Sequence, residues 1–167
     1  MANTQVFRYK EKLTVTQTPA SDDNSLGALK ANFPELELVW GTGVDVSESD
    51  VYWCDNDRSI ATATNDDLDL TALPAAGSPT GAAVNMAEVR AIFIEALSSN
   101  TTVLTMQPGA SNGWTALGAA LSLALEARTK QRLINEGDGA WPVSGSDTVL
   151  RIANASGATA RYRILIV

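Results

Sequence analysis

Carboxylates are the side chains best suited to chemistry in this 167-residue sequence, because it contains no histidine and a single cysteine, Cys54. Without histidine, the usual general base at neutral pH, the His-dependent nucleophile triads and zinc sites with imidazole ligands are all excluded. One thiol forms neither an intrachain disulfide nor a cysteine-only metal site. No imidazole is present to activate this thiol, so we interpret Cys54 as a small buried hydrophobic residue.

Aspartates gather in four short clusters. These are Asp22-Asp23, Asp45 with Asp50, Asp55 with Asp57, and Asp66-Asp67 with Asp69. Oxygen-rich loops bind calcium in EF-hands, but no cluster completes the EF-hand pattern with its glycine and final glutamate. Aspartate is also favoured in solvated turns, because its side chain hydrogen-bonds to the nearby backbone. We adopt the turn interpretation, with calcium binding as the alternative, and predict no metal, no cofactor and no catalytic residue.

Glycoside hydrolysis is the enzymatic alternative that this composition tolerates best, since it needs only two carboxylates about 5 to 10 Å apart. The sequence does not single out such a pair among its 19 acidic residues. We therefore expect a protein that is not an enzyme.

The four tryptophans are the second group of candidate residues: Trp40, Trp53, Trp114 and Trp141. Their rings could form a platform that stacks on sugars. Tryptophan is more often a core or interface residue, because its ring buries a large area and its N–H finds a partner. We predict that Trp53 lies in the core and that Trp114 and Trp141, at loop ends, belong to a contact surface.

Three arginines near the C-terminus form the third group. Arg151, Arg161 and Arg163 are predicted to lie on one face of a hairpin, as a basic stripe on an acidic protein. Such a stripe is either a solvated strand face paired with nearby Asp or Glu, or a docking patch for an acidic partner surface. We favour the paired face and keep these arginines, with the two loop tryptophans, as possible interface residues.

Charge and length limit the partners further. The formal net charge is −7, which argues against nucleic acid, since phosphate binding depends largely on Lys and Arg. No stretch reaches the roughly 18 apolar residues of a spanning helix and the start shows no apolar signal region, so we predict no membrane partner and synthesis in a cytoplasm. The length fits one domain, or one domain with an extension.

The first 48 residues have the composition of an extension. Turn-forming residues dominate 16–25, and alternating apolar residues predict short strands over 13–17 and 36–40. The segment 25–32 has room for one helical turn, which would end before Pro34 because the residue before proline avoids the α region. We predict an irregular N-terminal arm over 1–48 that docks on the main body.

From residue 49 onward the strand signals become regular. Val89–Ile94 is apolar on both parities, which predicts a central strand covered on both sides. Asn154–Gly157 predicts a hairpin turn between the last two strands, and in the final strand Tyr162, Ile164 and Ile166 share one face. Further strands are predicted over 51–54, 58–64, 66–70, 101–106, 147–153 and 159–167, with a loop over 74–85.

One segment, 117–128, fits both a helix and a strand. Its alanine and leucine content favours a helix, whereas the alternation of Leu121, Leu123 and Leu125 with smaller residues favours a strand. Short strand signals at regular spacing flank it on both sides, so we predict a strand. The predicted fold is all-β: an antiparallel β-sandwich or jelly-roll-like domain over 49–167, preceded by the arm.

Residues 57–167 resemble tailed-bacteriophage virion proteins. The resemblance lies in a series of segments without a catalytic signature: Asn65–Leu73, Val89–Ile94, Ser111–Trp114, Trp141–Val143, Leu150–Gly157 and Ala160–Val167. Proteins of this style are compact β-sandwich or jelly-roll modules on phage heads, often capsid decoration (cement) proteins or related fibre-base modules.

The resemblance implies a structural role on the virion. The protein would bind the major capsid protein on the exterior of the assembled capsid and stabilise the shell, with a homotrimer as the favoured oligomer. The N-terminal arm would order on binding or reach a neighbouring subunit. The alternatives are a tail or head-tail adaptor protein, and a carbohydrate-binding or depolymerising phage module.

Overall fold

The computed structural model describes residues 52–77, 82–135, 139–155 and 157–167, together with the backbone of four strands in the first 50 residues. The chain divides into two compact units, Met1–Asp50 and Val51–Val167, next to the sequence-based boundary between residues 48 and 49. In the described part of the chain, no helix is long and apolar enough to cross a membrane.

The first unit contains two antiparallel strand pairs, one nested inside the other. The strands are β1 (Phe7–Glu11), β2 (Thr14–Gln17), β3 (Leu29–Asn32) and β4 (Leu36–Trp40). β1 pairs with β4, and β2 pairs with β3. The predicted strand over 36–40 is thus confirmed, as is the strand over 13–17 for its described residues 14–17. The helical turn predicted within 25–32 is wrong for 29–32, which pair with β2, and 25–28 lie outside the described residues.

The pair β1–β4, which we call the ribbon, has a two-sided pattern. Phe7 lies opposite Trp40 and Tyr9 lies opposite Leu38 in the register. Opposite residues and alternate residues of a strand share a side, so these four positions fall on one side of the ribbon. The other side carries Arg8, Lys10, Glu37 and Val39.

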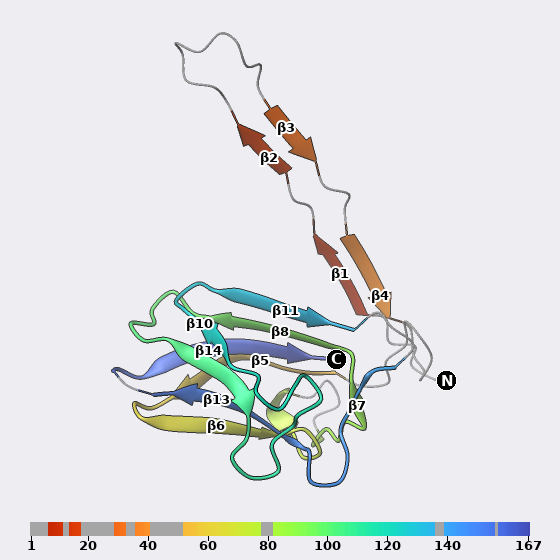
Figure 1. Cartoon of the computed structure of the whole chain (residues 1–167), viewed down its shortest axis with the longest axis vertical. Helices are drawn as coiled ribbons and strands as arrows, with labels where there is room; N and C mark the ends of the chain where they lie inside the picture. The colour runs from red at the N-terminus through yellow and green to blue at the C-terminus, as the bar shows by residue number, and fades with distance from the viewer. Residues whose placement is uncertain are drawn as a thin grey trace. The chain divides into compact units, whose positions relative to one another are not determined.

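The second unit is an antiparallel β-sandwich, as predicted (Figure 1). The first sheet has the order β10-β9-β13-β6, and the second sheet has the order β11-β8-β14-β5. The bounds are β5 Trp53–Ile60, β6 Thr64–Asp69, β8 Ala91–Ala96, β9 Leu104–Pro108, β10 Leu123–Leu125, β11 Lys130–Ile134, β13 Val149–Asn154 and β14 Ala160–Ile166. The short strands β7 (Glu88–Val89) and β12 (Trp141–Pro142) form a separate pair, and Ala75–Gly77 forms the 3-10 helix η1.

The eight sandwich strands pair in the order of one long hairpin: the first strand along the sequence pairs with the last, and the two middle strands pair with each other. β5 pairs with β14, β6 with β13, β8 with β11, and β9 with β10. The predicted hairpin over β13 and β14 is therefore wrong, since the two strands belong to different sheets. β13 and β14 turn their apolar faces toward the core from opposite sheets, and the connection between them crosses from the first sheet to the second.

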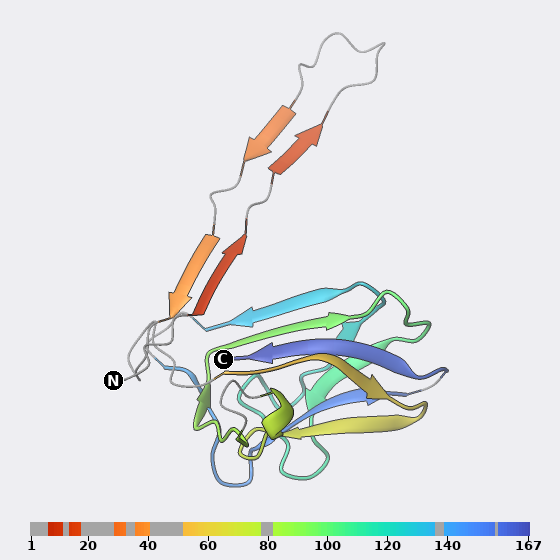
Figure 2. The same ribbon diagram turned by 180° about the vertical axis from the view of Figure 1, so that it is seen from behind.

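The core lies between the two sheets. Alternate residues of facing strands are fully buried, among them Leu68, Ile92, Leu104, Ile152 and Tyr162. Trp53 is also fully buried, as predicted, and its Nε1 donates a hydrogen bond to the Pro74 carbonyl at 2.8 Å. This bond explains why η1, which follows Pro74, lies beside the start of β5 in Figure 2.

Asn154 is a buried polar residue whose hydrogen bonds link two loops at one end of the sandwich. Its Nδ2 donates to the carbonyls of Ile60, Ala61 and Ala158 at 3.2, 3.1 and 3.0 Å, and its Oδ1 accepts from Thr102 Oγ1 at 3.1 Å. Both polar atoms of its side chain thus have partners where the β5–β6 turn meets the β13–β14 connection.

Several predicted strands differ from the observed ones in their bounds. The strand expected over 58–64 is interrupted by a turn between β5 and β6, where Ala63 has a φ of 55°. β9 covers 104–108 instead of 101–106. In the ambiguous segment 117–128 only 123–125 form a strand, β10, which buries Leu125, and the rest is turn and irregular structure.

Candidate functional site: an interlayer ion cluster and a cationic sheet face

A β-bulge in β5 turns two charged residues toward the interior. Tyr162 of β14 lies opposite Arg58, but Ile164, only two residues on, lies opposite Asp55. β5 therefore has one extra residue at this point, and the bulge changes which side alternate residues face. Asp55 and Arg58 consequently share the inner side of the second sheet with Tyr162 and Ile164, which are buried.

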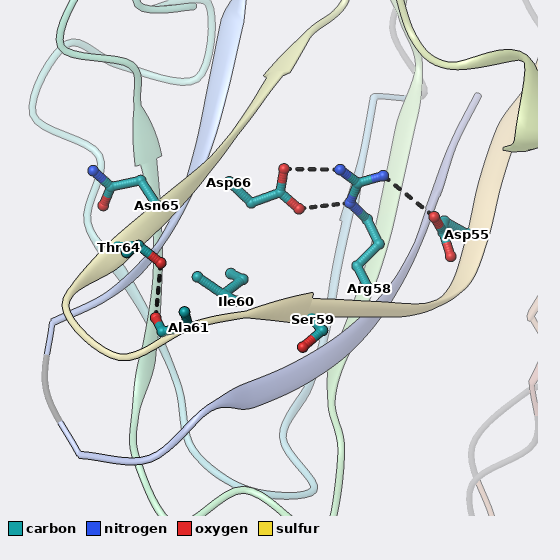
Figure 3. Close-up of a pocket in the computed structure, with 8 residues that line it drawn as sticks. All are labelled: Asp55, Arg58, Ser59, Ile60, Ala61, Thr64, Asn65 and Asp66. Carbon is teal, nitrogen blue, oxygen red and sulfur yellow. Dashed lines mark hydrogen bonds and ion pairs between the residues drawn. The ribbon is translucent and has the colours of Figure 1, made fainter.

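The inward-facing residues form an ion cluster between the two sheets. Arg58 donates from Nε and Nη2 to the two carboxylate oxygens of Asp66 at 2.6 and 2.8 Å, and from Nη1 to Asp55 at 3.2 Å (Figure 3). Tyr162 donates its hydroxyl to Asp66 at 2.7 Å, and the Arg58 guanidinium lies 5.5 Å from the centre of the Trp53 ring.

Asp66 belongs to β6 and Arg58 to β5, which are edge strands of the first and the second sheet. The side chains of Arg58 and Asp66 are only 20 % and 17 % exposed, so their bidentate pair is shielded from water. This pair joins the two sheets at their shared open edge.

The geometry of the cluster fixes the protonation states of Arg58 and Tyr162. The hydrogen bonds from Arg58 to Asp66 raise the pKa of the guanidinium further above its usual value, so it remains a cation. Burial, and next the negative charge of Asp66, raise the pKa of the Tyr162 hydroxyl well above its usual value. Tyr162 is therefore a protonated donor to Asp66 over the physiological pH range.

A polar hollow of about 340 Å³ opens beside this cluster. Asp55, Arg58 and Asp66 line it together with Ser59, Ile60, Ala61, Thr64 and Asn65, as Figure 3 shows. Both of its carboxylates bind the same guanidinium, so the arrangement is that of a structural ion cluster. Among the described residues, no group of three or more Asp, Glu or Cys side chains is arranged to hold a metal ion.

The turn chemistry predicted for the aspartate clusters is confirmed for Asp69, at the end of β6, and is wrong for Asp55, Asp57, Asp66 and Asp67, which lie within the strands β5 and β6. Asp69 Oδ1 accepts hydrogen bonds from Thr71 Oγ1 at 2.7 Å and from its backbone N–H at 3.0 Å, which lowers the pKa of Asp69. Asp55 Oδ1 accepts from the backbone N–H of Asp57 at 3.0 Å. Asp22, Asp23, Asp45 and Asp50 lie outside the described residues.

The outward residues of the second sheet form a cationic surface, which we call the outer face. One row across the strands runs Cys54, Leu165, Phe93 and Arg132, and the next runs Arg163, Glu95 and Lys130. Arg163 pairs with Glu95 at 2.9 Å, Lys130 lies 3.7 Å from the same carboxylate, and Arg161 pairs with Asp57.

The three arginines singled out in the sequence do not form a single stripe. Arg161 and Arg163 lie on the outer face, whereas Arg151 lies on the other side of the sandwich, because β13 belongs to the first sheet. Arg151 binds both carboxylate oxygens of Asp67 at 2.6 and 2.7 Å, which raises the pKa of Arg151 and lowers the pKa of Asp67. All three arginines are paired with acids, as the interpretation that we favoured requires.

The two loop tryptophans pack against each other. Their rings meet edge to face, with centroids 6.4 Å apart and planes at 83°. Trp114 is buried, and its Nε1 donates to the Pro142 carbonyl at 2.8 Å, so the expectation that it lies on a contact surface is wrong for this ring. Trp141 is partly buried against the core. Trp114 is held at this place because its backbone N–H donates to the Val149 carbonyl, whereas Trp141 comes from β12, where it pairs with Val89.

Sequence reasoning missed two parts of these sites. The inward orientation of Arg58 depends on the bulge, which has no signal in the sequence. Phe93, Lys130 and Arg132 join the arginines of β14 only through the pairing of β8 with β11 and β14. Alternation within a strand predicts which side of that strand a residue faces, but it does not predict which strands are neighbours in the sheet.

A comparison with protein-family models, curated proteins and solved structures found no match. The geometry of the chain itself therefore carries the functional argument.

Proposed function

We propose that this chain is a structural, non-enzymatic virion protein of a tailed bacteriophage, which binds the exterior of the assembled capsid and stabilises it. The observation that supports this most is the order of the strands. Pairing of the first strand with the eighth, the second with the seventh, the third with the sixth and the fourth with the fifth describes one long hairpin wrapped into two sheets. We assign this order to the jelly roll, a fold of viral capsid and lectin domains.

Decoration of a capsid needs a rigid module and a segment that takes hold of the lattice. The sandwich provides the rigid module, because its core is continuous and its open edge is closed by the Arg58–Asp66 pair. The first unit provides the segment that contacts the lattice. A two-stranded ladder is at best marginally stable in water, so it gains stability when another surface covers it.

Stabilisation follows from binding to one state of the shell. A protein that contacts the major capsid protein only in the assembled lattice shifts the equilibrium away from disassembly, by about 2.7 kcal/mol per site at a concentration one hundred times its Kd. Capsid sites are symmetric, so a homotrimer at three-fold positions is the oligomer that we propose.

Particles that lack this protein provide the test. Purified protein added to such particles should co-sediment with mature capsids and raise the temperature at which they release DNA. Immature shells of the same phage are the control, and they should bind it weakly. Failure to co-sediment with mature capsids would rule out the decoration role.

A carbohydrate-binding module is the alternative that one observation favours, since lectins also use the jelly roll and the polar hollow beside Arg58 is lined with hydroxyl, amide and carboxylate groups. Trp53 and Trp114 are buried and provide no stacking platform. Saturable binding of a host polysaccharide, abolished by Asn65→Ala at the rim of the hollow, would support this alternative.

A further inference from the structure

We propose that the free edge of β10 pairs with β10 of a second copy of this chain, so that the first sheets of two sandwiches join into one continuous sheet. The contact lies within the second unit and has two-fold symmetry. A two-fold contact does not close a trimer. The inference therefore goes beyond the proposed function, because the contact joins copies that belong to neighbouring trimers.

β10 is the last strand of the first sheet, and among the described strands only β9 pairs with it. Gly109, next to β9, donates its backbone N–H to Val149 of β13. The backbone groups of successive residues in an antiparallel strand face opposite neighbours, so those of Leu104 and Met106 face β10. The residues opposite these two flank Ala124, and the N–H and C=O of Ala124 consequently point away from β9 to the free edge.

The other edges of the sandwich carry features that keep sheet edges from pairing. β5 contains a β-bulge, and β6 and β11 carry charged side chains. β10 has neither feature, since no charged residue stands between Glu95 and Glu126. Its free backbone groups are therefore open to an extended chain, which is the structure that matches unpaired N–H and C=O groups along a strand.

The β10 sequence is complementary to itself in a two-fold pair centred on Ala124. In this register Ala124 exchanges two backbone hydrogen bonds with its own counterpart, and Leu123 lies opposite Leu125 of the second copy. Ser122 lies opposite Glu126 of the second copy, so no like charges meet.

The inner side of β10 adds apolar surface to the contact. Leu125 is buried and Leu123 is partly buried against the core of its own sandwich. Pairing of two β10 strands places the leucines of both copies on one side of the joined sheet, so the two cores meet across the contact. The outer side of β10 contributes Ala124, which is exposed and small.

Charge identifies β10 as the occupant among the edge strands of the second copy. β5, β6 and β11 would bring charged side chains against an uncharged edge, where these side chains lose water without gaining an opposite charge. A second β10 brings no charge within its strand bounds.

Sedimentation of the full chain tests the contact with two variants at one position. Ala124→Pro removes the N–H that points to the free edge and no hydrogen bond to β9, which is the position where a strand tolerates proline. Ala124→Thr keeps this N–H and is the control. We expect Ala124→Pro to weaken self-association at least about tenfold, and Ala124→Thr to change it by less than about twofold. Equal effects, or a wild-type protein that stays a monomer or a trimer at every concentration, would overturn the proposal.

Disulfide formation tests the register and does not depend on the folding of the proline variant. In a chain with Cys54→Ala, which removes the native thiol, Ala124→Cys places two thiols opposite each other, with Cα atoms about 5.5 Å apart, as a disulfide requires. Ser122→Cys in the same background is the control, because its thiols would lie more than about 10 Å apart. We expect covalent dimers to form at least about tenfold faster with Ala124→Cys. Equal rates contradict the inference.

An extended segment of another virion protein is the other possible occupant of this edge. Weaker binding of Ala124→Pro to mature capsids, together with no covalent dimer for Ala124→Cys, would assign the edge to such a segment and overturn pairing between copies. Capsid co-sedimentation of the wild type is measured separately, and its failure would rule out decoration while leaving the self-association of the purified chain unchanged.

Discussion

At the scale of single residues, the Arg58–Asp66 ion pair links the two sheets where their edge strands β5 and β6 face each other. The pair is shielded, bidentate and supported by Tyr162, whereas the Arg151–Asp67 pair has the same geometry on the outside, with Asp67 half exposed. Burial decides how much each pair contributes to the free energy of unfolding. Removing one partner of a shielded pair leaves a buried charge without compensation, while an exposed pair contributes little.

Asp66→Asn should therefore lower the free energy of unfolding by about 1 to 3 kcal/mol, because it removes the carboxylate that both Arg58 and Tyr162 contact. Asp67→Asn is the matched control, and it should cost less than about 1 kcal/mol. Urea unfolding measures both values. Equal losses for the two variants would show that the interlayer pair has no special role.

The raised pKa of Tyr162 predicts an alkaline effect. In the folded state its pKa lies above the unfolded value of about 10, so the folded chain holds this proton more tightly. The resulting stability is complete below pH 10 and is lost as the pH rises above it. Tyr162→Phe should make the unfolding free energy less sensitive to pH above 10, and an unchanged slope would contradict the assignment.

At the scale of elements, the end of the sandwich near Asn154 depends on close packing of two loops. Gly157 has a φ of 90°, and a Cβ at this position would overlap Thr102 Cγ2, whose hydroxyl donates to Asn154. The backbone conformation and the limited space both require glycine here.

Gly157→Ala should destabilise the protein by about 1 to 3 kcal/mol more than Gly118→Ala does. Gly118 also has a positive φ, 117°, but no atom lies within 4 Å of a Cβ built there, so this control isolates the steric part. Thermal unfolding of the two variants gives the comparison. A smaller loss at Gly157 than at Gly118 would contradict the packing described here.

The sequence predicted individual strands better than their partners. Alternation correctly placed Tyr162, Ile164 and Ile166 on the buried face of β14, and it assigned Arg161 and Arg163 to the outside. It failed for the β13–β14 hairpin, because alternation shows which side of a strand is buried and not which strand lies beside it. The ion cluster was hidden for the same reason, since Asp66 and Arg58 meet only when β5 and β6 close the two layers.

At the scale of the whole molecule, composition and fold support the same conclusion. A chain without histidine, with a net charge of −7, a sandwich and a two-stranded ribbon fits the structural role that we propose. No residue pattern in the sequence identified the outer face in advance, because it comes from four strands that are spread along the chain.

Deletion of residues 1–48 tests whether the first unit makes the contacts with the capsid while the sandwich folds without it. The remaining sandwich should keep its cooperative unfolding, because its core lies within Val51–Val167. It should lose most of its occupancy on capsids, since we assign contact with the lattice to the first unit. Unchanged occupancy and particle stability would contradict this role for the N-terminal unit.

Electron cryomicroscopy of intact virions that encode this chain tests the central claim most directly. We predict density for the sandwich on the outside of the capsid, repeated at symmetric positions between major capsid subunits and lost from particles without the protein. Density confined to the tail or the head-tail junction, or no density on the particle, would contradict it.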